Sequence, residues 1–180
     1  MRVNNENKDT VLLWTDVETT GLDPTVDGLL EVGLQATTTG LEPLADMVSV
    51  VVQPGELGRV HPKVQRMHTA NGLLRESLKG LPVRAASRLL DSYLREWAGR
   101  RILLAGSSVG FDRRWFDVKM PGLLDGCHHR VFDVSALDEM MRAWKPGLWE
   151  ARPKHETQHR VADCLTGSLT LARYYREALK

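Results

Sequence analysis

The feature of this sequence that most constrains its fold is a short apolar run that leads directly into two carboxylates. Residues 11–14 are Val-Leu-Leu-Trp, and Asp16 and Glu18 follow them. The apolar run is typical of a buried strand, and side chains two residues apart on a strand point to the same face. Two like charges beside a buried strand repel each other and lose hydration, so the pair favours a site for a divalent cation. The alternative is a solvated Asp-x-Glu at a strand end, with Gly21 opening a turn.

The length and apolar content of the chain predict one globular domain. The chain has 180 residues, of which 42% are hydrophobic, and this is enough to form a full core. We expect that domain to span residues 9–180. Residues 1–8 are mostly polar and are predicted to be a disordered tail.

The charge balance argues against a surface that grips long nucleic acid. The chain contains 24 basic residues (Lys and Arg) and 23 acidic ones (Asp and Glu), which gives a net charge of +1. A basic field over the whole protein is therefore not expected. Either the substrate is not a long polyanion, or the attraction for it is local.

The cysteines and the short apolar runs predict a cytoplasmic protein without a membrane span. Cys127 and Cys164 match neither a metal-ligand spacing nor a disulfide framework, so we expect reduced thiols. Residues 1–10 contain no apolar signal core. No apolar run approaches the roughly 20 residues needed to cross a bilayer.

The hydrophobic pattern predicts strands first, followed by an alternation of helices and strands. Apolar runs between turn residues predict a meander of three strands at residues 11–17, 30–37 and 47–52. Helical spacing predicts a helix over residues 82–97, with Pro82 in its first turn. The later segments are predicted as a strand at 102–105, a short helix at 111–118, a strand at 130–134, a helix capped by Ser135 that reaches Trp144, a loop at 145–158, and a last helix from about 159 to 179. This order indicates an α/β fold, with a mixed five-stranded sheet flanked by helices and the later strands parallel to the first.

A third carboxylate, Asp112, lies between a predicted strand and a predicted helix. It follows the glycine-containing segment at residues 106–111, and turns of this kind present polar groups at the rim of a sheet. The alternative is an acid in the first turn of a helix, where the helix dipole favours negative charge.

His159 and Asp163 are spaced four residues apart in the last predicted helix. Residues with this spacing share a helical face, so we expect the two side chains to lie along one edge of the apolar stripe. The alternative is an ordinary His–Asp pair on the surface.

Taken together, these residues form the set that a two-metal site requires. Asp16, Glu18, Asp112 and Asp163 are expected to hold two divalent ions about 3.5–4 Å apart, which orient a water and neutralise the leaving oxygen. His159 is then expected to act as the general base on that water, because the unperturbed pKa of histidine, about 6.5, is close to working pH.

The order Asp-x-Glu, then Asp, then His-x-x-x-Asp resembles the DEDD-type 3′–5′ exonucleases in their histidine-containing branch. The chain is more similar still to the oligoribonuclease family within that group. The resemblance runs from Leu12 to the C-terminus and is carried by residues 14–24, 68–73, 106–114, 130–135, 142–146 and 174–177. It implies a ribonuclease H-like fold, two Mg²⁺ or Mn²⁺ ions per active site, and a homodimer.

The resemblance also implies an activity on very short RNA. The family removes nucleotides from the 3′ end of oligoribonucleotides, down to dinucleotides, and releases 5′-mononucleotides. Leu22 matches a leucine that wedges between the two bases, and His68 matches a histidine that lies by the substrate. Both residues are therefore predicted to bind substrate.

The resemblance further implies a cap over the 5′ phosphate. Ser108, Arg130 and Ser135 match the residues that form it, and His129 stands where the family has a tyrosine contributed by the partner subunit. The chemistry agrees, because arginine binds a phosphate bidentately and serine hydroxyls donate to its oxygens. A dinucleotide needs a few placed contacts rather than a basic groove, which fits a net charge of +1.

Two other functions fit parts of the same pattern. One is a general DNA or RNA 3′–5′ exonuclease, such as a polymerase proofreading subunit, and the cap residues argue against it. The other is a catalytically inactive nucleic-acid-binding module. The intact carboxylate set and His159 argue against the second alternative, because binding alone does not need all of them.

Overall fold

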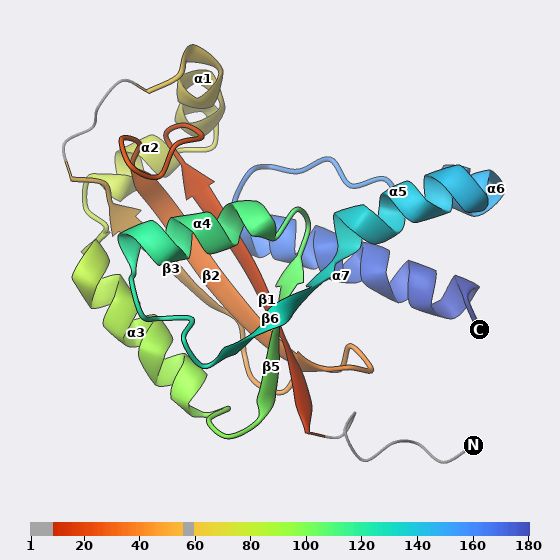
Figure 1. The fold of residues 1–180 in the computed structure, drawn as a ribbon. Coiled ribbons are helices and arrows are strands. Elements are labelled where there is room, and N and C mark those ends of the chain that lie inside the picture. The colour runs from red at the N-terminus through yellow and green to blue at the C-terminus, as the bar shows by residue number, and fades with distance from the viewer. Residues whose placement is uncertain (1–8, 56–59) are drawn as a thin grey trace.

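A mixed β-sheet forms the centre of the structure (Figure 1). The computed structural model describes residues 9–55 and 60–180, so the predicted tail at residues 1–8 lies outside the described residues. Within those ranges the strands are β1 (Thr10–Thr19), β2 (Leu29–Thr38), β3 (Val48–Gln53), β4 (Leu81–Pro82), β5 (Arg101–Gly106) and β6 (Cys127–Asp133). They follow the order β4-β3-β2-β1-β5-β6. β2 is antiparallel to β1 and β3, whereas β5 is parallel to β1 and to β6, as the predicted topology requires.

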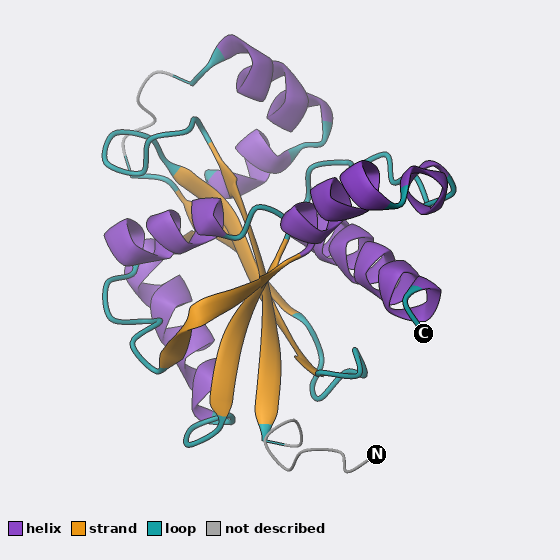
Figure 2. Ribbon diagram, turned by 45° about the vertical axis from the view of Figure 1, so that its right-hand side comes forward, coloured by secondary structure: helices purple, strands orange, loops and turns teal. Residues whose placement is uncertain are grey.

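Helices cover both faces of this sheet (Figure 2). The helices are α1 (Pro62–Ala70), α2 (Leu73–Ser77), α3 (Val83–Arg95), α4 (Gly110–Lys119), α5 (Val134–Trp144), α6 (Pro146–Glu150) and α7 (Val161–Ala178). α3 and α4 pack into one apolar core with the sheet, whereas α7 and the start of α5 pack into a second core on the other face. No helix in the described part of the chain combines the length and apolar character needed to cross a bilayer.

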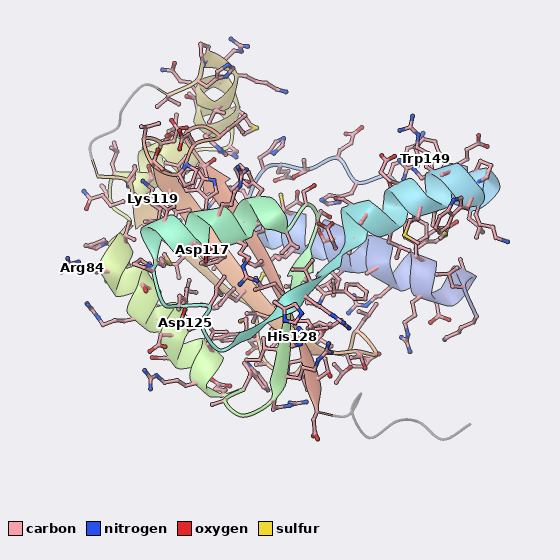
Figure 3. All side chains as sticks on the ribbon, in the orientation of Figure 1. Arg84, Asp117, Lys119, Asp125, His128 and Trp149 are labelled. Atoms are coloured by element: carbon pink, nitrogen blue, oxygen red, sulfur yellow. The ribbon has the colours of Figure 1, made fainter. Side chains whose placement is uncertain are left out.

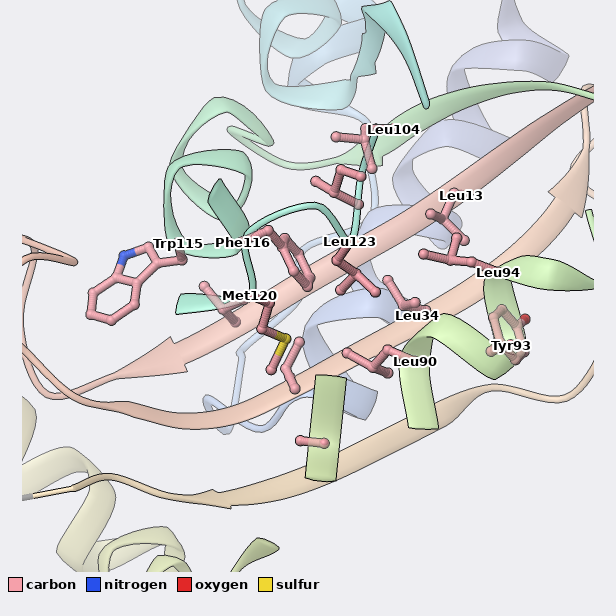
Figure 4. Packing of buried hydrophobic residues seen from close by; sticks show 14 of the residues in the cluster. Leu13, Leu34, Leu90, Tyr93, Leu94, Leu104, Trp115, Phe116, Met120 and Leu123 are labelled. Atoms are coloured by element: carbon pink, nitrogen blue, oxygen red, sulfur yellow. The ribbon is translucent and has the colours of Figure 1, made fainter. Parts of the chain in front are cut away.

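β1 is buried on both faces, and its alternate side chains pack into different cores. Leu13 joins the core formed with α3 and α4, where it lies among Leu34 and Leu90 (Figure 4). Leu12 and Trp14 belong to the opposite core, beneath α7. Because side chains alternate along a strand, the even-numbered row that begins with Leu12 continues to Asp16 and Glu18 on the α7 face.

Gly33 allows α7 to begin close to this row. It pairs with Asp16 in the register of β1 and β2. A Cβ at Gly33 would lie 2.4 Å from Val161 Cγ1 and 2.8 Å from the Val48 carbonyl oxygen. Only glycine lets the first turn of α7 approach the sheet at the level of Asp16 without displacing one of them.

The structure adds short elements that hydrophobic patterning does not predict. β4 adds a sixth strand, of two residues, to the five predicted ones, and it pairs with β3. α1 has only His68 buried and therefore has no apolar stripe to detect. α2 and α6 have five residues each, which is too few to show a helical period. The predicted loop at residues 145–158 therefore contains α6.

Two predicted helix starts are wrong. Asp133, rather than Ser135, caps α5, because its side chain accepts hydrogen bonds from the Ser135 and Ala136 backbone N–H groups. The last helix begins at Val161 with Arg160 as its N-cap, so His159 precedes it. Aspartate is a good N-cap, and its presence two residues before Ser135 is the signal that sequence patterning did not use.

The surface over α3 and α4 carries charges of both signs. Figure 3 shows Arg84, Asp117, Lys119 and Asp125 on this side of the molecule.

Candidate active site

Three carboxylates lie at the carboxyl ends of two neighbouring strands. Asp16 and Glu18 lie on β1, and Asp112 lies in the first turn of α4, which follows β5. β1 and β5 are parallel neighbours, so their carboxyl ends meet at one edge of the sheet. Glu18 is 7% exposed and Asp112 3% exposed. The structure therefore brings Asp16 and Glu18 together, with one oxygen of each within 4.8 Å of the other. Asp112 lies near enough for its charge to raise the pKa of Asp16.

The close approach of these carboxylates is unfavourable when they are charged. Burial, followed by the charges of Asp112 and Glu18, raises the pKa of Asp16 to about 9. Burial is also the main cause that raises the pKa of Glu18 to about 7 and the pKa of Asp112 to about 8. Like charges in a region of low dielectric favour the protonated forms unless a cation compensates them.

The donor set fits a divalent cation. Asp16 Oδ2 is buried and has no hydrogen-bond partner among the described residues. A buried carboxylate oxygen without a partner is rare, and carboxylates are the ligands that hard divalent cations prefer. Asp16, Glu18 and Asp112 would hold such an ion.

Asp163, the fourth predicted ligand, is not in the group of ligand atoms formed by Asp16 and Glu18. Its Oδ2 accepts a hydrogen bond from the Gln158 backbone N–H at 2.7 Å and lies 3.1 Å from His155 Nε2. The Gln158 N–H, followed by His155, lowers the pKa of Asp163. The expectation that His159 and Asp163 share a helical face is wrong, because α7 begins between them.

Cys164 occupies the place beside the carboxylates instead. Its Sγ and one oxygen each of Asp16 and Glu18 all lie within 4.8 Å of one another. The thiol donates a hydrogen bond to Glu18 Oε1 at 3.6 Å. The sequence spacing of the two cysteines did not indicate this position, because the partners of Cys164 are distant in sequence and are not cysteines.

His159 faces the same region from the segment before α7. It has a φ of 52°, in the left-handed region. With Asp16 it lines a cavity of about 570 Å³, whose other lining residues include Ser107, Arg152, Lys154, His155 and Cys164. His159, the predicted base, and Asp16, a predicted metal ligand, therefore line the same cavity.

His68 lies against the cluster rather than in open solvent. It is fully buried on α1, and its Nε2 is 3.4 Å from Glu18 Oε2. Burial, followed by the charge of His159, lowers the pKa of His68. His68, which is predicted to lie by the substrate, thus lies beside the Glu18 carboxylate.

The serines of the predicted phosphate cap lie together. Ser108 Oγ donates to Ser135 Oγ at 3.2 Å. Asp133 Oδ1 accepts from the backbone N–H groups of both Ser108, at 3.0 Å, and Ser135, at 2.9 Å. Asp133 therefore holds the two serines in place.

The other predicted substrate-binding residues are exposed on separate elements. Leu22 is 77% exposed in the loop between β1 and β2. Arg130 and His129 are exposed on β6, at the edge of the sheet near His128 (Figure 3). The rings of His128 and His129 stack with centroids 4.2 Å apart, and the Arg130 backbone N–H donates to His128 Nδ1 at 3.0 Å.

The fold and the buried carboxylates define a nuclease of the exonuclease class, and comparison with known proteins identifies its family. A family model described as an exonuclease, RNase_T, matches residues 13–166. The oligoribonuclease of Tropheryma whipplei (strain Twist) is 37% identical over 169 residues, which cover 92% of this chain and 91% of that protein. The oligoribonuclease of Sodalis glossinidius is 35% identical, with 98% of this chain and 97% of that protein covered. The chain belongs to the oligoribonuclease family of exonucleases.

Solved structures of a different exonuclease share the fold. A structure of exonuclease I matches with a TM-score of 0.75 at 14% identity, over 93% of this chain and 41% of that one. Exonuclease I from Methylocaldum szegediense matches with a TM-score of 0.64 at 18% identity, over 93% of this chain and 40% of the other. The chain thus spans about two fifths of the length of these proteins and shares their ribonuclease H-like architecture.

Proposed function

We propose that this protein is a 3′–5′ exoribonuclease that hydrolyses dinucleotides and other very short RNA to 5′-mononucleotides, with two Mg²⁺ or Mn²⁺ ions in each active site. The observation that carries the proposal is the buried Asp16 oxygen, which has no hydrogen-bond partner among the described residues and lies near Glu18 and Asp112. The named relatives are oligoribonucleases over almost the whole chain. An inactive binding module would gain nothing from a cluster of carboxylates that raise one another's pKa.

The chain's own residues divide the work of hydrolysis. When bound, the divalent ions supply charge neutralisation and an activated water. Asp16, Glu18 and Asp112 would hold them, and Asp163, which lies 3.1 Å from His155 in this structure, would complete the set. His159 accepts the proton of the attacking water at an imidazole nitrogen, from its place on the same cavity as Asp16.

A preference for very short RNA is supported by the serine pair and the exposed leucine. Ser108 and Ser135, held by Asp133, present hydroxyl groups that donate to a 5′ phosphate. Arg130 adds a guanidinium from the exposed strand β6. Leu22 is exposed enough to pack between two bases. A cap of this kind limits the number of nucleotides between the 5′ phosphate and the scissile bond.

The protein is proposed to act as a homodimer. β6 is an edge strand, and Val131 on it is 43% exposed. Met140 and Trp144 on α5 are 41% and 66% exposed. A second copy would cover these apolar groups and bring its His129 towards the cap. Sedimentation velocity of the protein and of Trp144→Glu tests this: the wild type should sediment as a dimer and the variant as a monomer.

The proposed compartment is the cytoplasm. Cys127 and Cys164 are both free thiols in the structure, and thiols persist in a reducing environment. Cell fractionation followed by immunodetection checks the compartment directly.

Cleavage assays on substrates of different length test the activity. RNA of two, seven and twenty nucleotides and matching DNA, each labelled at the 5′ end, are incubated with the protein and Mg²⁺ or Mn²⁺. The dinucleotide should be hydrolysed fastest. Equal rates on long DNA would favour a general exonuclease, the class whose fold this chain shares. No cleavage of any substrate would favour an inactive binding module.

The role of Asp163 needs a separate test, because its carboxylate lies with His155 in this structure. Asp163→Ala should lower turnover by about 100-fold or more while the chain stays folded, since several kcal/mol of charge stabilisation depend on the ligand set. Asp125→Ala, an exposed acid on the opposite side of the sheet, is the matched control. Full activity of Asp163→Ala, with activity lost in Cys164→Ala instead, would reassign the fourth ligand.

A further inference from the structure

The backbone that carries His159 adopts a conformation that needs support. His159 has a φ of 52°, whereas Arg160 after it is extended, with a φ of −125°. The chain therefore turns sharply between Gln158 and α7. Residues other than glycine stay in the left-handed region mainly where surrounding groups hold them there.

Asn71, which caps the C-terminus of α1, holds this turn from one side. Its Nδ2 donates to the carbonyl oxygens of Gln158, at 2.9 Å, and His159, at 2.8 Å. Its Oδ1 accepts from the Leu73 backbone N–H at 3.1 Å. One amide thus connects the start of α2 to the two residues that set the direction of the His159 side chain.

Arg160 holds the turn from the other side. Its Nε and Nη2 lie 2.9 and 3.1 Å from the two carboxylate oxygens of Glu31, and its Nη2 lies 2.8 Å from Glu76 Oε2. Glu31 is 4% exposed on β2 and also accepts from the Val161 backbone N–H at 3.2 Å. A bidentate pair with a buried carboxylate fixes both position and orientation. The residues on either side of His159 are therefore anchored to β2, α1 and α2.

We propose that Asn71 is a positioning residue for His159. It acts on the reaction by holding the His159 backbone so that the imidazole stays on the cavity shared with Asp16. This inference rests on the proposed function, in which His159 is the general base. Its consequence is that Asn71 governs the chemical step through His159 rather than through substrate affinity.

Asn71→Asp tests the donor role with little change of shape. The aspartate keeps an oxygen for the Leu73 N–H but replaces the donating nitrogen with an acceptor that faces two carbonyl oxygens. We expect kcat on a 5′-phosphorylated dinucleotide to fall roughly 10- to 100-fold, because displacement of a catalytic group by about 1 Å has effects of this size. The loss should appear in kcat more than in KM, although Asn71 Nδ2 also lies 3.3 Å from His68 Nδ1, because the variant leaves the cap serines in place.

A double-mutant cycle separates positioning from general destabilisation. In a His159→Ala background, Asn71→Asp should cause no further loss of kcat, because the group on which it acts is already absent. Tyr93→Phe is the matched control: it removes a buried hydrogen bond, from the Ala36 N–H to the Tyr93 hydroxyl, far from the turn. This control should lower Tm while kcat stays at the wild-type value.

The outcomes are distinct for each proposal. Wild-type kcat in Asn71→Asp, or an equal fold-loss with and without His159, overturns the positioning role. Wild-type protein that does not hydrolyse the dinucleotide, or His159→Ala with full kcat, overturns the proposed function and this inference together. If Tyr93→Phe lowered kcat as much as Asn71→Asp does for the same decrease in Tm, the positioning role would also be overturned. Loss of fold stability alone would then explain the lower kcat.

Discussion

The two sides of the active site are held in place by different kinds of structure. Asp16 and Glu18 lie on β1, which is paired with β2 on one side and β5 on the other. His159 and Asp163 lie at the start of α7, where side-chain hydrogen bonds from other elements set the backbone. The strand side fixes its carboxylates although they repel one another, whereas the α7 side lets Asp163 pair with His155. We infer from this comparison that the strand side is the rigid part of the proposed metal site, whereas the Asp163 side chain, which is paired with His155, is the part of the α7 side that adjusts.

The largest expected effect is on the rigid side. Asp16→Asn should lower kcat by about 10²–10⁴-fold, because several kcal/mol of charge stabilisation depend on the ions that it holds. Dinucleotide hydrolysis under saturating substrate measures this, with the exposed Asp117→Asn as control. If the two variants were equally active, the strand side would not be the metal template.

The second expected effect concerns the stability of the metal-free protein. The pKa values of Glu18, Asp112 and Asp16 are raised to about 7, 8 and 9, above the values of about 4 in an unfolded chain. The folded state then keeps protons that the unfolded state releases. This stabilisation is fully present below about pH 4 and is lost as the pH rises through the folded-state pKa values, by about 1.4 kcal/mol per pH unit for each carboxyl that remains protonated.

Urea unfolding in EDTA at pH 6, 7.5 and 9 measures this loss. Asp16→Asn should flatten the pH dependence, and Mg²⁺ or Mn²⁺ should restore the stability of the wild type at pH 9. An identical pH dependence in the wild type and the variant would mean that the pKa of Asp16 is not raised in the folded protein.

A smaller effect is expected where the two sides meet. Gly33→Ala places a Cβ 2.4 Å from Val161 Cγ1 and 2.8 Å from the Val48 carbonyl oxygen, so the start of α7 must shift. We expect a loss of about 1–3 kcal/mol of stability, measured by urea unfolding, and a roughly tenfold lower kcat. Gly147→Ala, where nothing lies within 4 Å of the added Cβ, should change neither.

The smallest expected effect is on the adjustable side. His155→Ala removes the group that lies 3.1 Å from Asp163 Oδ2. Because exposed pairs of this kind are worth about 0.2–1 kcal/mol, Mn²⁺ binding should tighten by up to about fivefold, as measured by titration calorimetry. Glu139→Ala breaks a more exposed pair with Arg142 and should leave the affinity unchanged. Weaker Mn²⁺ binding in His155→Ala would show that His155 supports the metal-binding position of Asp163 rather than competing for it.

The sequence predictions were correct on the strand side of the site and failed at the start of α7. The period of two along β1 was enough to put Asp16 and Glu18 on one face, and the strand-to-helix transition was enough to bring Asp112 to the same edge. At α7 the four-residue spacing failed, because the helix begins at Val161, after His159, and has Asp163 and Cys164 in its first turn. The anchors of that turn, Asn71 and Glu31, lie about 90 and 130 residues away along the chain, and no local pattern links them to it.

The sequence by itself determined the α/β class, the family, and the strand that carries the first two carboxylates. These depend on local periodicity and on short motifs, both of which can be read along the chain. Only the tertiary structure decided that Cys164 rather than Asp163 lies beside Glu18, that Gly33 admits α7, and that Asn71 supports His159. These depend on where a helix begins and on which distant groups lie next to it, and packing sets both.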